Sequence, residues 1–232
     1  MDSGRYARQL QLAEIGEAGQ QKLARASVLI VGLGGLGAPV ATYLVGAGIG
    51  RVGLCDPDVV SMSNLQRQVL YTEDEVGLPK TACAACRLSA ISGHTVIEQY
   101  PDGLTACNAD ALIGAYDIVV DCCDNFRTRY LIDDVCAAVG KPWVYGSIGA
   151  FHGQVAVMNG PSGLRYSTLY PDRAELEARP AASGGVLGVV PGVIGAIEAG
   201  EVIKLIAGFG EPLDGRLFTI NLKTLQTDII EF

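Results

Sequence analysis

Four closely spaced glycines are the first residues of this sequence that could do chemistry. They follow an apolar, β-rich run at residues 28–31 and precede a helix-like stretch at residues 38–47. Glycine lets a backbone come close to an anion, and the N–H groups at the start of a helix point toward it. The order strand, glycine turn and helix therefore predicts a binding site for nucleotide phosphates. The glycines are Gly32, Gly34, Gly35 and Gly37.

Asp56 is a candidate for holding the sugar of that nucleotide. It ends the next apolar run, residues 51–55, at roughly the 20-residue distance where a carboxylate usually binds a ribose hydroxyl. We therefore expect an adenine nucleotide to bind near residues 32–56. The glycines alone do not distinguish a dinucleotide used for hydride transfer from ATP used for activation.

Polar and basic residues follow Asp56 at spacings that suit phosphate binding. Asn64 and Arg67 are three residues apart, so they share one face of a helical turn. Lys80 follows Pro79, which suits the first turn of a helix. A cation at a helix N-terminus gains nothing from the helix dipole, and a phosphate nearby would account for its position.

Asp124 follows another expected strand, residues 117–121, within the motif DCCDN. A carboxylate beyond the carboxyl end of a parallel strand points toward the ligand-binding edge of the sheet. There Asp124 could hold Mg²⁺ bound to phosphates. The alternative is that Asp124 caps the helix expected to begin near Phe126.

The elements that must position these residues alternate along the first 150 residues. Such alternation predicts an α/β fold, a Rossmann-like, doubly wound and mostly parallel sheet with helices on both faces. The expected strands are residues 27–31, 51–55, 95–100, 117–121 and 143–146, and the expected helices are residues 36–47, 79–91, 105–113 and 126–139.

The pattern changes after residue 150, where we expect antiparallel strands to be added to the sheet. A segment rich in small and charged residues, 172–185, is expected to be a mobile surface loop. Because no linker interrupts the sequence, we expect a single domain, residues 1–232. The further strands are expected at residues 154–158, 217–222 and 227–232, and a helix at residues 193–207.

Composition excludes several classes of function. A formal net charge of −8 argues against general nucleic-acid binding, which favours basic surfaces. The longest apolar stretch, residues 186–197, is shorter than the roughly 20 residues of a membrane span. The first residues lack the apolar core of a signal peptide, and seven cysteines suit a reducing compartment. We therefore expect a cytoplasmic protein without a membrane segment.

Taken together, these residues resemble the HesA/MoeB/ThiF family, which is related to the ubiquitin-activating enzymes. The resemblance extends over about residues 5–230, nearly the whole sequence. Each motif is weak alone, but their order is highly specific. The motifs are RYARQ at 5–9, GLGGLG at 32–37, SNLQRQ at 63–68, PK at 79–80 and DCCDN at 121–125.

The resemblance implies a definite reaction. Members of this family bind ATP with Mg²⁺ and the Gly-Gly C-terminus of a small ubiquitin-like sulfur-carrier protein. The terminal carboxylate attacks the α-phosphate, which gives an acyl-adenylate and pyrophosphate. Residues from 1 to about 150 would form the nucleotide-binding half, and residues from about 151 to 232 the carrier-binding half.

The resemblance also implies roles for single residues. The glycine turn would pack near the nucleotide, with Gly35 close to it, and Asp56 would hold the ribose. Asp124 would help to place the Mg²⁺. Arg8 would reach into the site of a neighbouring subunit, which implies a homodimer. Asn64, Arg67 and Lys80 would face the phosphates, and the catalytic residues would be Arg8, Arg67, Lys80 and Asp124.

The sequence departs from the family pattern in its cysteines. Many members hold a structural zinc with two Cys-x-x-Cys pairs, but Arg165 and Thr168 stand where the first pair would fall, and the sequence stops at Phe232 where the second would follow. A loop cysteine that some members use for sulfur transfer would fall near Ala181, yet no cysteine follows Cys136. We therefore expect no zinc. We also expect the reaction to stop at the acyl-adenylate, with a partner such as a sulfurtransferase supplying the sulfur.

Two other functions remain open at this point. A nicotinamide-dependent oxidoreductase would account for residues 32–56 but leaves Arg67, Lys80 and Asp124 without a role. A family member that binds nucleotide and partner without turnover is allowed by the missing cysteines. The identity of the carrier is also open among thiamin, molybdopterin, cysteine and secondary-metabolite pathways.

Overall fold

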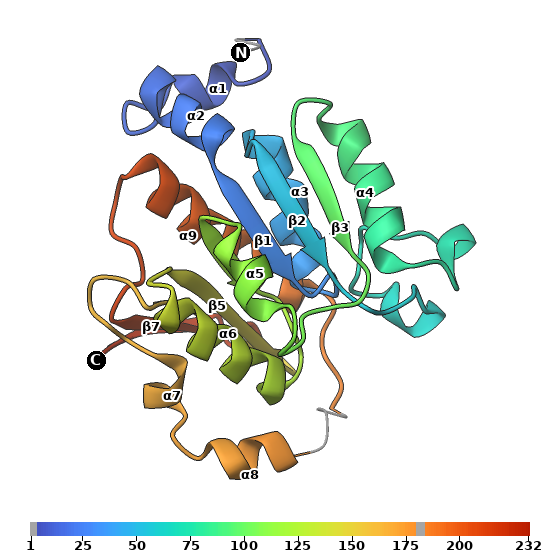
Figure 1. Ribbon diagram of the computed structural model, residues 1–232, viewed down its shortest axis with the longest axis vertical. Helices are drawn as coiled ribbons and strands as arrows, with labels where there is room; N and C mark the ends of the chain where they lie inside the picture. Colours follow the sequence, from blue (N-terminus) through green and yellow to red (C-terminus); the bar gives the residue numbers. More distant parts are fainter. Residues whose placement is uncertain (1–3, 180–183) are drawn as a thin grey trace.

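One mixed sheet of eight strands lies at the centre of the computed structural model, which describes residues 4–179 and 184–232 (Figure 1). The strands are β1 (Ser27–Val31), β2 (Arg51–Cys55), β3 (Val96–Tyr100), β4 (Ile118–Asp121), β5 (Trp143–Gly149), β6 (His152–Met158), β7 (Arg216–Asn221) and β8 (Gln226–Glu231). They lie in the order β3-β2-β1-β4-β5-β6-β7-β8. The first five in this order are parallel, and β6, β7 and β8 are antiparallel to their neighbours. The predicted fold class is confirmed.

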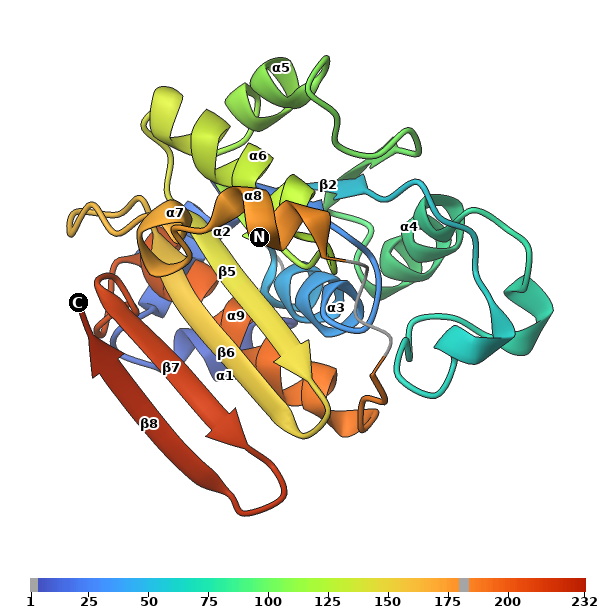
Figure 2. The ribbon, with the colours of Figure 1, turned by 90° about the horizontal axis from the view of Figure 1, so that it is seen from below.

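Helices cover both faces of the parallel part of the sheet. The α-helices of the described residues are α1 (Ala7–Leu10), α2 (Gly16–Arg25), α3 (Gly37–Ala47), α4 (Lys80–Ile91), α5 (Ala109–Gly114), α6 (Phe126–Ala138), α7 (Tyr166–Leu169), α8 (Arg173–Ala178) and α9 (Val189–Ala207). Of these, α1 packs on α2, and α7 and α8 pack on α6. α3 and α9 pack together on one face, whereas α5 and α6 lie on the other (Figure 2). Short 3₁₀ turns at Met62–Asn64 and Glu73–Glu75 lie between β2 and α4.

The sheet has its topological switch point between β1 and β4. β1 pairs with β2 on one side and with β4 on the other. All five residues of β1 are buried, as expected for a parallel strand covered on both faces. Doubly wound sheets bind ligands beyond the carboxyl ends of the strands at this point. The glycine turn follows β1 and the DCCDN motif follows β4, so the fold brings these two motifs to the same edge.

The predicted elements differ from the observed ones mainly at their ends. α9 begins at Val189 rather than at residue 193, because Pro191 is tolerated in the first turn of a helix. α5 begins at Ala109 rather than at residue 105, because the side chain of Asn108 accepts a hydrogen bond from Thr105 N and holds a turn there. The short helices α1, α2 and α7 were not predicted.

The prediction of a loop over residues 172–185 is wrong in part. Helix α8 occupies the beginning of this stretch, and Arg173 Nη1 lies 2.6 Å from Asp134 Oδ2 on α6. This long-range ion pair is not visible in the local sequence, which reads as polar and irregular. The predicted mobility stays a prediction, and residues 180–183 lie outside the described residues.

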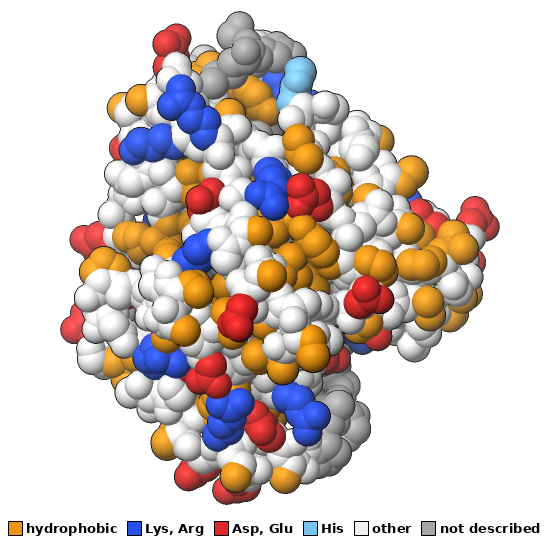
Figure 3. All heavy atoms as spheres, viewed as in Figure 1, with side chains coloured by type: hydrophobic (Ala, Val, Ile, Leu, Met, Phe, Trp, Pro, Cys, Tyr) orange, Lys and Arg blue, Asp and Glu red, His pale blue; other side chains and the backbone are white. Residues whose placement is uncertain are grey.

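The surface carries both signs of charge. Basic and acidic side chains are interspersed on the face in Figure 3, and no broad basic area is seen among the described residues of that face. In the part of the chain that the structure describes, every helix is too short or too polar to cross a bilayer.

Candidate active site

The glycine turn is held tightly between the ends of β1 and β4. Gly32 has φ +94°, and a Cβ there would lie 2.6 Å from Cys122 O. A Cβ on Gly37 would lie 2.1 Å from Gly32 O. Since real Cβ atoms do not approach so closely, only glycine fits these two positions. Gly32 and Gly37 therefore shape the turn that precedes α3.

Gly34 and Gly35 form the half-buried surface of the turn. A Cβ on Gly34 would lie 3.5 Å from Gln68 Nε2, and one on Gly35 would lie 3.0 Å from Pro191 and 3.6 Å from Arg67 Cγ. The turn therefore meets the SNLQRQ segment on one side and the beginning of α9 on the other. The structure brings Gly35 and Arg67 together, and their expected contact with a nucleotide stays a prediction.

Asp56 is fixed directly against the glycine turn. Asp56 is 5% exposed, and its Oδ2 accepts a hydrogen bond of 2.6 Å from Leu33 N. The other oxygen, Oδ1, accepts one of 2.8 Å from Asp58 N. The carboxylate expected to bind the ribose therefore also sets the shape of the turn, a role that the sequence did not reveal.

Lys80 supplies a buried positive charge to the same carboxylate. Its Nζ lies 3.9 Å from Asp56 Oδ2 and 2.9 Å from Asp58 Oδ2. Burial raises the pKa of Asp56 above its usual value, while Lys80 and the two backbone donors oppose this shift. Lys80 begins α4, as expected, but the anions beside it in this structure are the carboxylates of Asp56 and Asp58, and the expected phosphate stays a prediction.

Arg67 and Asn64 lie in one helical turn beside the glycine turn. Arg67 N donates to Asn64 O over 3.0 Å, and Arg67 Nη1 donates to Ser63 O over 3.1 Å. Within the described residues, no carboxylate lies at ion-pair distance from Arg67. The positive charge of this half-buried side chain is therefore not balanced by an acid of the described chain.

Asp124 is exposed, and it does not cap α6. The N-cap is Asn125, whose Oδ1 accepts a hydrogen bond of 2.9 Å from Thr128 N. The alternative of Asp124 as the helix cap is therefore wrong. Asp124 follows the carboxyl end of β4, two residues after Cys122, and no hydrogen bond or ion pair engages its carboxylate within residues 4–179 and 184–232.

A buried ion pair between α6 and the end of β4 fixes the turn that carries Asp124. Arg129 Nε on α6 lies 3.0 Å from Asp121 Oδ2, and Arg129 Nη2 donates to Cys123 O over 2.8 Å. Asp121 Oδ1 accepts from Cys123 N over 3.0 Å. Burial raises the pKa of Asp121, and Arg129 counteracts this shift. The pair therefore fixes the backbone between β4 and Asp124.

Arg8 does not join the other residues within one chain. It is exposed on α1, next to Gln9, whose Nε2 donates to Ala47 O at the end of α3 (3.1 Å). The glycine turn lies at the beginning of α3, and this 11-residue helix is about 16 Å long. Arg8 therefore lies at the opposite end of the helix from the glycine turn.

Sequence reasoning missed Gln68. This residue is 4% exposed, its amide lies against Gly34, and its Oε1 is among the buried side-chain atoms of the described chain that lack a hydrogen-bond partner. Its sequence signal is its place at the end of the SNLQRQ motif, directly after Arg67, although no role was assigned to it there. Because this amide packs against the glycine turn, its unpaired oxygen could accept a hydrogen bond from a nucleotide bound there.

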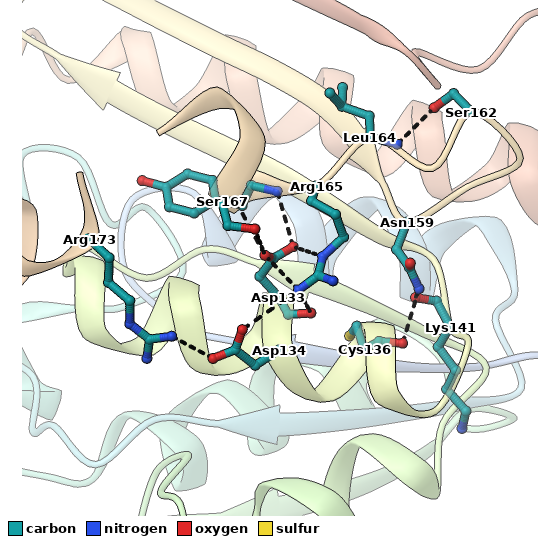
Figure 4. A network of polar contacts seen from close by, with 11 residues as sticks. Asp133, Asp134, Cys136, Lys141, Asn159, Ser162, Leu164, Arg165, Ser167 and Arg173 are labelled. Atoms are coloured by element: carbon teal, nitrogen blue, oxygen red, sulfur yellow. Dashed lines mark hydrogen bonds and ion pairs between the residues drawn. The ribbon is translucent and has the colours of Figure 1, made fainter. Parts of the chain in front are cut away.

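A separate polar network occupies the position where many family members carry the first Cys-x-x-Cys pair. Asp133 on α6 is buried, and its carboxylate accepts hydrogen bonds from Arg165, from the backbone of Tyr166 and from Ser167 (Figure 4). Arg165 Nε lies 2.9 Å from Asp133 Oδ1. No group of three or more potential metal-binding side chains occurs in the described ranges. The network fastens the segment after β6 to α6.

Comparison with known families shows to which family the chain belongs. The model of the ThiF family matches residues 6–232. The chain belongs to the ThiF family. The resemblance seen in the sequence is thereby confirmed.

Two curated relatives show how much of this ThiF family chain they share. It is 48% identical over 219 residues to a sulfur carrier protein adenylyltransferase of Thermus thermophilus, covering 92% of this chain and 81% of the relative. It is 46% identical over 214 residues to the adenylyltransferase and sulfurtransferase MOCS3 of Mus musculus, covering 92% of this chain. The chain spans 46% of that relative, about half the length of the MOCS3 proteins it matches.

Solved structures share the fold of this ThiF family chain at lower identity. The crystal structure of E. coli MccB with ATP has a TM-score of 0.83 at 24% identity and covers 98% of this chain and 71% of that one. The structure of PaaA has a TM-score of 0.83 at 22% identity and covers 99% and 73%. At this identity the likeness supports the fold alone.

Proposed function

We propose that this chain is an ATP-dependent adenylyltransferase that activates the C-terminal glycine carboxylate of a small, ubiquitin-like sulfur-carrier protein. The observation that carries the proposal is that the glycine turn, the buried Lys80 and Arg67 converge at one edge of the sheet. Arg67 has no carboxylate partner among the described residues. An adenylating site needs this combination. The relatives named above, which are adenylyltransferases by name, support the same reaction.

The positions of the side chains support nucleotide binding at this edge of the sheet. The half-buried Gly34 and Gly35 leave the turn open to phosphates, and the N–H groups at the start of α3 point toward them. Asp56 lies at the edge of this turn, where it binds the ribose. Arg67 and Lys80, together with Asn64, face the phosphates.

The chemical step joins two anions. An oxygen of the glycine carboxylate attacks the α-phosphorus, the bond from that phosphorus to the bridging oxygen of the β-phosphate breaks, and pyrophosphate leaves. The product is a mixed anhydride of the carrier with AMP. Arg67 and Lys80 offset the repulsion between the reactants and stabilise the charge that develops in the transition state. The step needs no side-chain nucleophile.

Asp124 fits the binding of Mg²⁺ that arrives with ATP. Its exposed carboxylate is a hard oxygen ligand, and it has no role as a helix cap. When bound, Mg²⁺ neutralises charge on the triphosphate. A structural zinc is not part of this proposal, because Arg165, held by Asp133, stands where a cysteine would be needed.

Arg8 completes the site from a second subunit in this proposal. Its position on α1, far from the glycine turn of its own chain, supports a contribution across a homodimer. The sulfur for later transfer comes from a partner such as a sulfurtransferase. We place this reaction in the cytoplasm, in keeping with seven cysteines that suit a reducing compartment.

A nicotinamide-dependent oxidoreductase is not retained. The relatives at 46–48% identity carry adenylyltransferase names. An oxidoreductase also gives no role to the unbalanced charge of Arg67. The non-catalytic alternative remains as one outcome of the experiment.

ATP–pyrophosphate exchange tests the proposal. Candidate carriers ending in Gly-Gly are added, with the same carriers lacking the last glycine as matched controls. We expect exchange only with the intact carriers, and Arg67→Ala should lower it by about two orders of magnitude. ATP binding without exchange for any carrier would establish a non-catalytic protein instead.

A further inference from the structure

Glu198 on α9 is a buried acid that the proposed reaction does not use. It is 0% exposed, and its carboxyl packs against β5, where a Cβ on Gly146 would lie 2.2 Å from Oε1. The thiol of Cys122, at the end of β4, donates to Glu198 Oε1 over 3.9 Å. The other oxygen, Oε2, has no hydrogen-bond partner in the described part of the chain.

The nearest cation, Arg129, does not neutralise a negative charge on Glu198. Asp121 is the other buried carboxylate here, and Arg129 pairs with it. The Nη2 group of Arg129 donates to the carbonyl oxygens of Cys123 and Gly146. The guanidinium of Arg129 is therefore already engaged by Asp121, and it makes no ion pair with Glu198.

The other elements packed against α9 do not add a cation near Glu198 in the described ranges. On α3 the ionisable side chain is Tyr43, which is exposed, and on β6 it is His152, which is also exposed. Lys22 on α2 donates to Ala207 O over 2.8 Å, at the far end of α9. Glu198 is thus isolated from both solvent and free positive charge.

These surroundings favour the neutral form of the acid. Burial raises the pKa of Glu198 well above its ordinary value, Asp121 raises it further, and Arg129 opposes the shift. A neutral carboxyl in this position costs less than an ionised one without a partner.

Cys122 connects Glu198 with the nucleotide site. A Cβ on Gly32 would lie 2.6 Å from Cys122 O, and one on Gly37 would lie 3.6 Å from Cys122 Cβ. Asp124 follows two residues later. A displacement of Cys122 would therefore move both the glycine turn and the acid that the proposed function assigns to Mg²⁺.

We propose that Glu198 is a positioning residue that, in its protonated form, fixes Cys122 and through it the glycine turn and Asp124. The inference rests on the proposed function for its nucleotide. Ionisation of Glu198 places a negative charge beside Asp121 and pushes the end of β4 away from α9. ATP binding therefore weakens at alkaline pH as Glu198 ionises.

Glu198→Gln tests the role, because the amide keeps the shape and an acceptor oxygen but cannot ionise. We expect its ATP affinity to stay within about twofold of the wild type at neutral pH. Above the pH at which Glu198 ionises, wild-type affinity should fall about tenfold per pH unit, and the variant should lack this decrease. Alkaline profiles that overlap would overturn the proposal.

Glu201→Gln is the matched control on the same helix. Glu201 is also buried, but it pairs with Lys204 and accepts a hydrogen bond of 2.8 Å from Leu213 N. This variant should keep the alkaline profile of the wild type even where its melting temperature falls. An equal change in both variants would contradict a specific role for Glu198.

Melting temperature without nucleotide separates this inference from the proposed function. The folded protein holds the Glu198 proton more tightly than the unfolded chain does. The wild type should therefore lose stability relative to Glu198→Gln as pH rises from the ordinary pKa of Glu to the raised pKa of Glu198. A stability difference that does not change with pH would overturn the inference, even if ATP binds. The expected melting difference without ATP binding would show that Glu198 is protonated in the folded protein and would contradict the proposed function.

Discussion

The ammonium group of Lys80 lies 3.9 Å from the carboxylate of Asp56, and their side chains are only 5% and 6% exposed. Asp58, the other partner of Lys80, is 67% exposed. Lys80 therefore joins an inner acid that shapes the glycine turn to an outer acid at the surface. A phosphate that enters the site would find this cation already held in place.

Replacing Lys80 by Met should destabilise the protein as well as abolish exchange. The Asp56 carboxylate would remain buried against Leu33 N without its cation, and breaking such a buried pair costs about 3 kcal/mol. Urea unfolding measures this loss. Asp58→Asn is the control and should cost less than about 1 kcal/mol, because its carboxylate is exposed. Equal losses in both variants would mean that Lys80 does not stabilise Asp56.

The destabilisation by Lys80→Met should depend on pH. Lys80 lowers the pKa of Asp56, which burial has raised, so its removal raises this pKa further. An acid with a raised folded pKa is best tolerated when protonated. The loss of stability should therefore be largest at neutral pH and shrink as pH falls through the folded pKa of Asp56 in the variant. A loss that stays constant from neutral to acid pH would contradict this assignment.

Asp124 and Asn125 should give opposite results when each is replaced by Ala. Asp124→Ala should lower exchange by at least about a hundredfold with little change in melting temperature, because this carboxylate is exposed and does not cap a helix. Asn125→Ala removes the cap of α6 and should cost about 1 kcal/mol of stability. If Asp124→Ala instead lost stability and kept exchange, its proposed role at the metal would be wrong.

Mixed dimers test whether Arg8 acts across subunits. Arg8→Ala and Asp124→Ala homodimers should both be inactive. A dimer with one subunit of each kind keeps one site with an intact Asp124 and the partner's intact Arg8, so part of the exchange should return. Verified mixed dimers without any recovered exchange would exclude a contribution of Arg8 from the second subunit.

The sequence predicted the parts of the site that depend on local order. The glycine turn and Asp56 follow apolar runs directly, Asp124 comes soon after the end of β4, and a parallel sheet brings such positions to one edge. Strands were recognisable for the same reason, since those covered on both faces consist of short apolar runs. The general place of Arg67 followed from its motif.

Contacts between distant segments were not predictable. Glu198 lies 76 residues from Cys122, and nothing in the helical pattern of α9 indicates a carboxyl packed against β5. The link from Asp56 to Leu33 N depends on the exact shape of the turn. The position of α1 at the end of α3, which separates Arg8 from the site, likewise depends on tertiary packing.

The origin of one oxygen atom tests the central claim most directly. A carrier with oxygen-18 in its terminal carboxylate is incubated with ATP, and the acyl-adenylate is cleaved at its carbonyl carbon with hydroxylamine. Attack of the carboxylate on the α-phosphorus predicts that one labelled oxygen appears in AMP and none in pyrophosphate. Label in pyrophosphate, or unlabelled AMP formed together with the hydroxamate, would contradict adenylation by this chain.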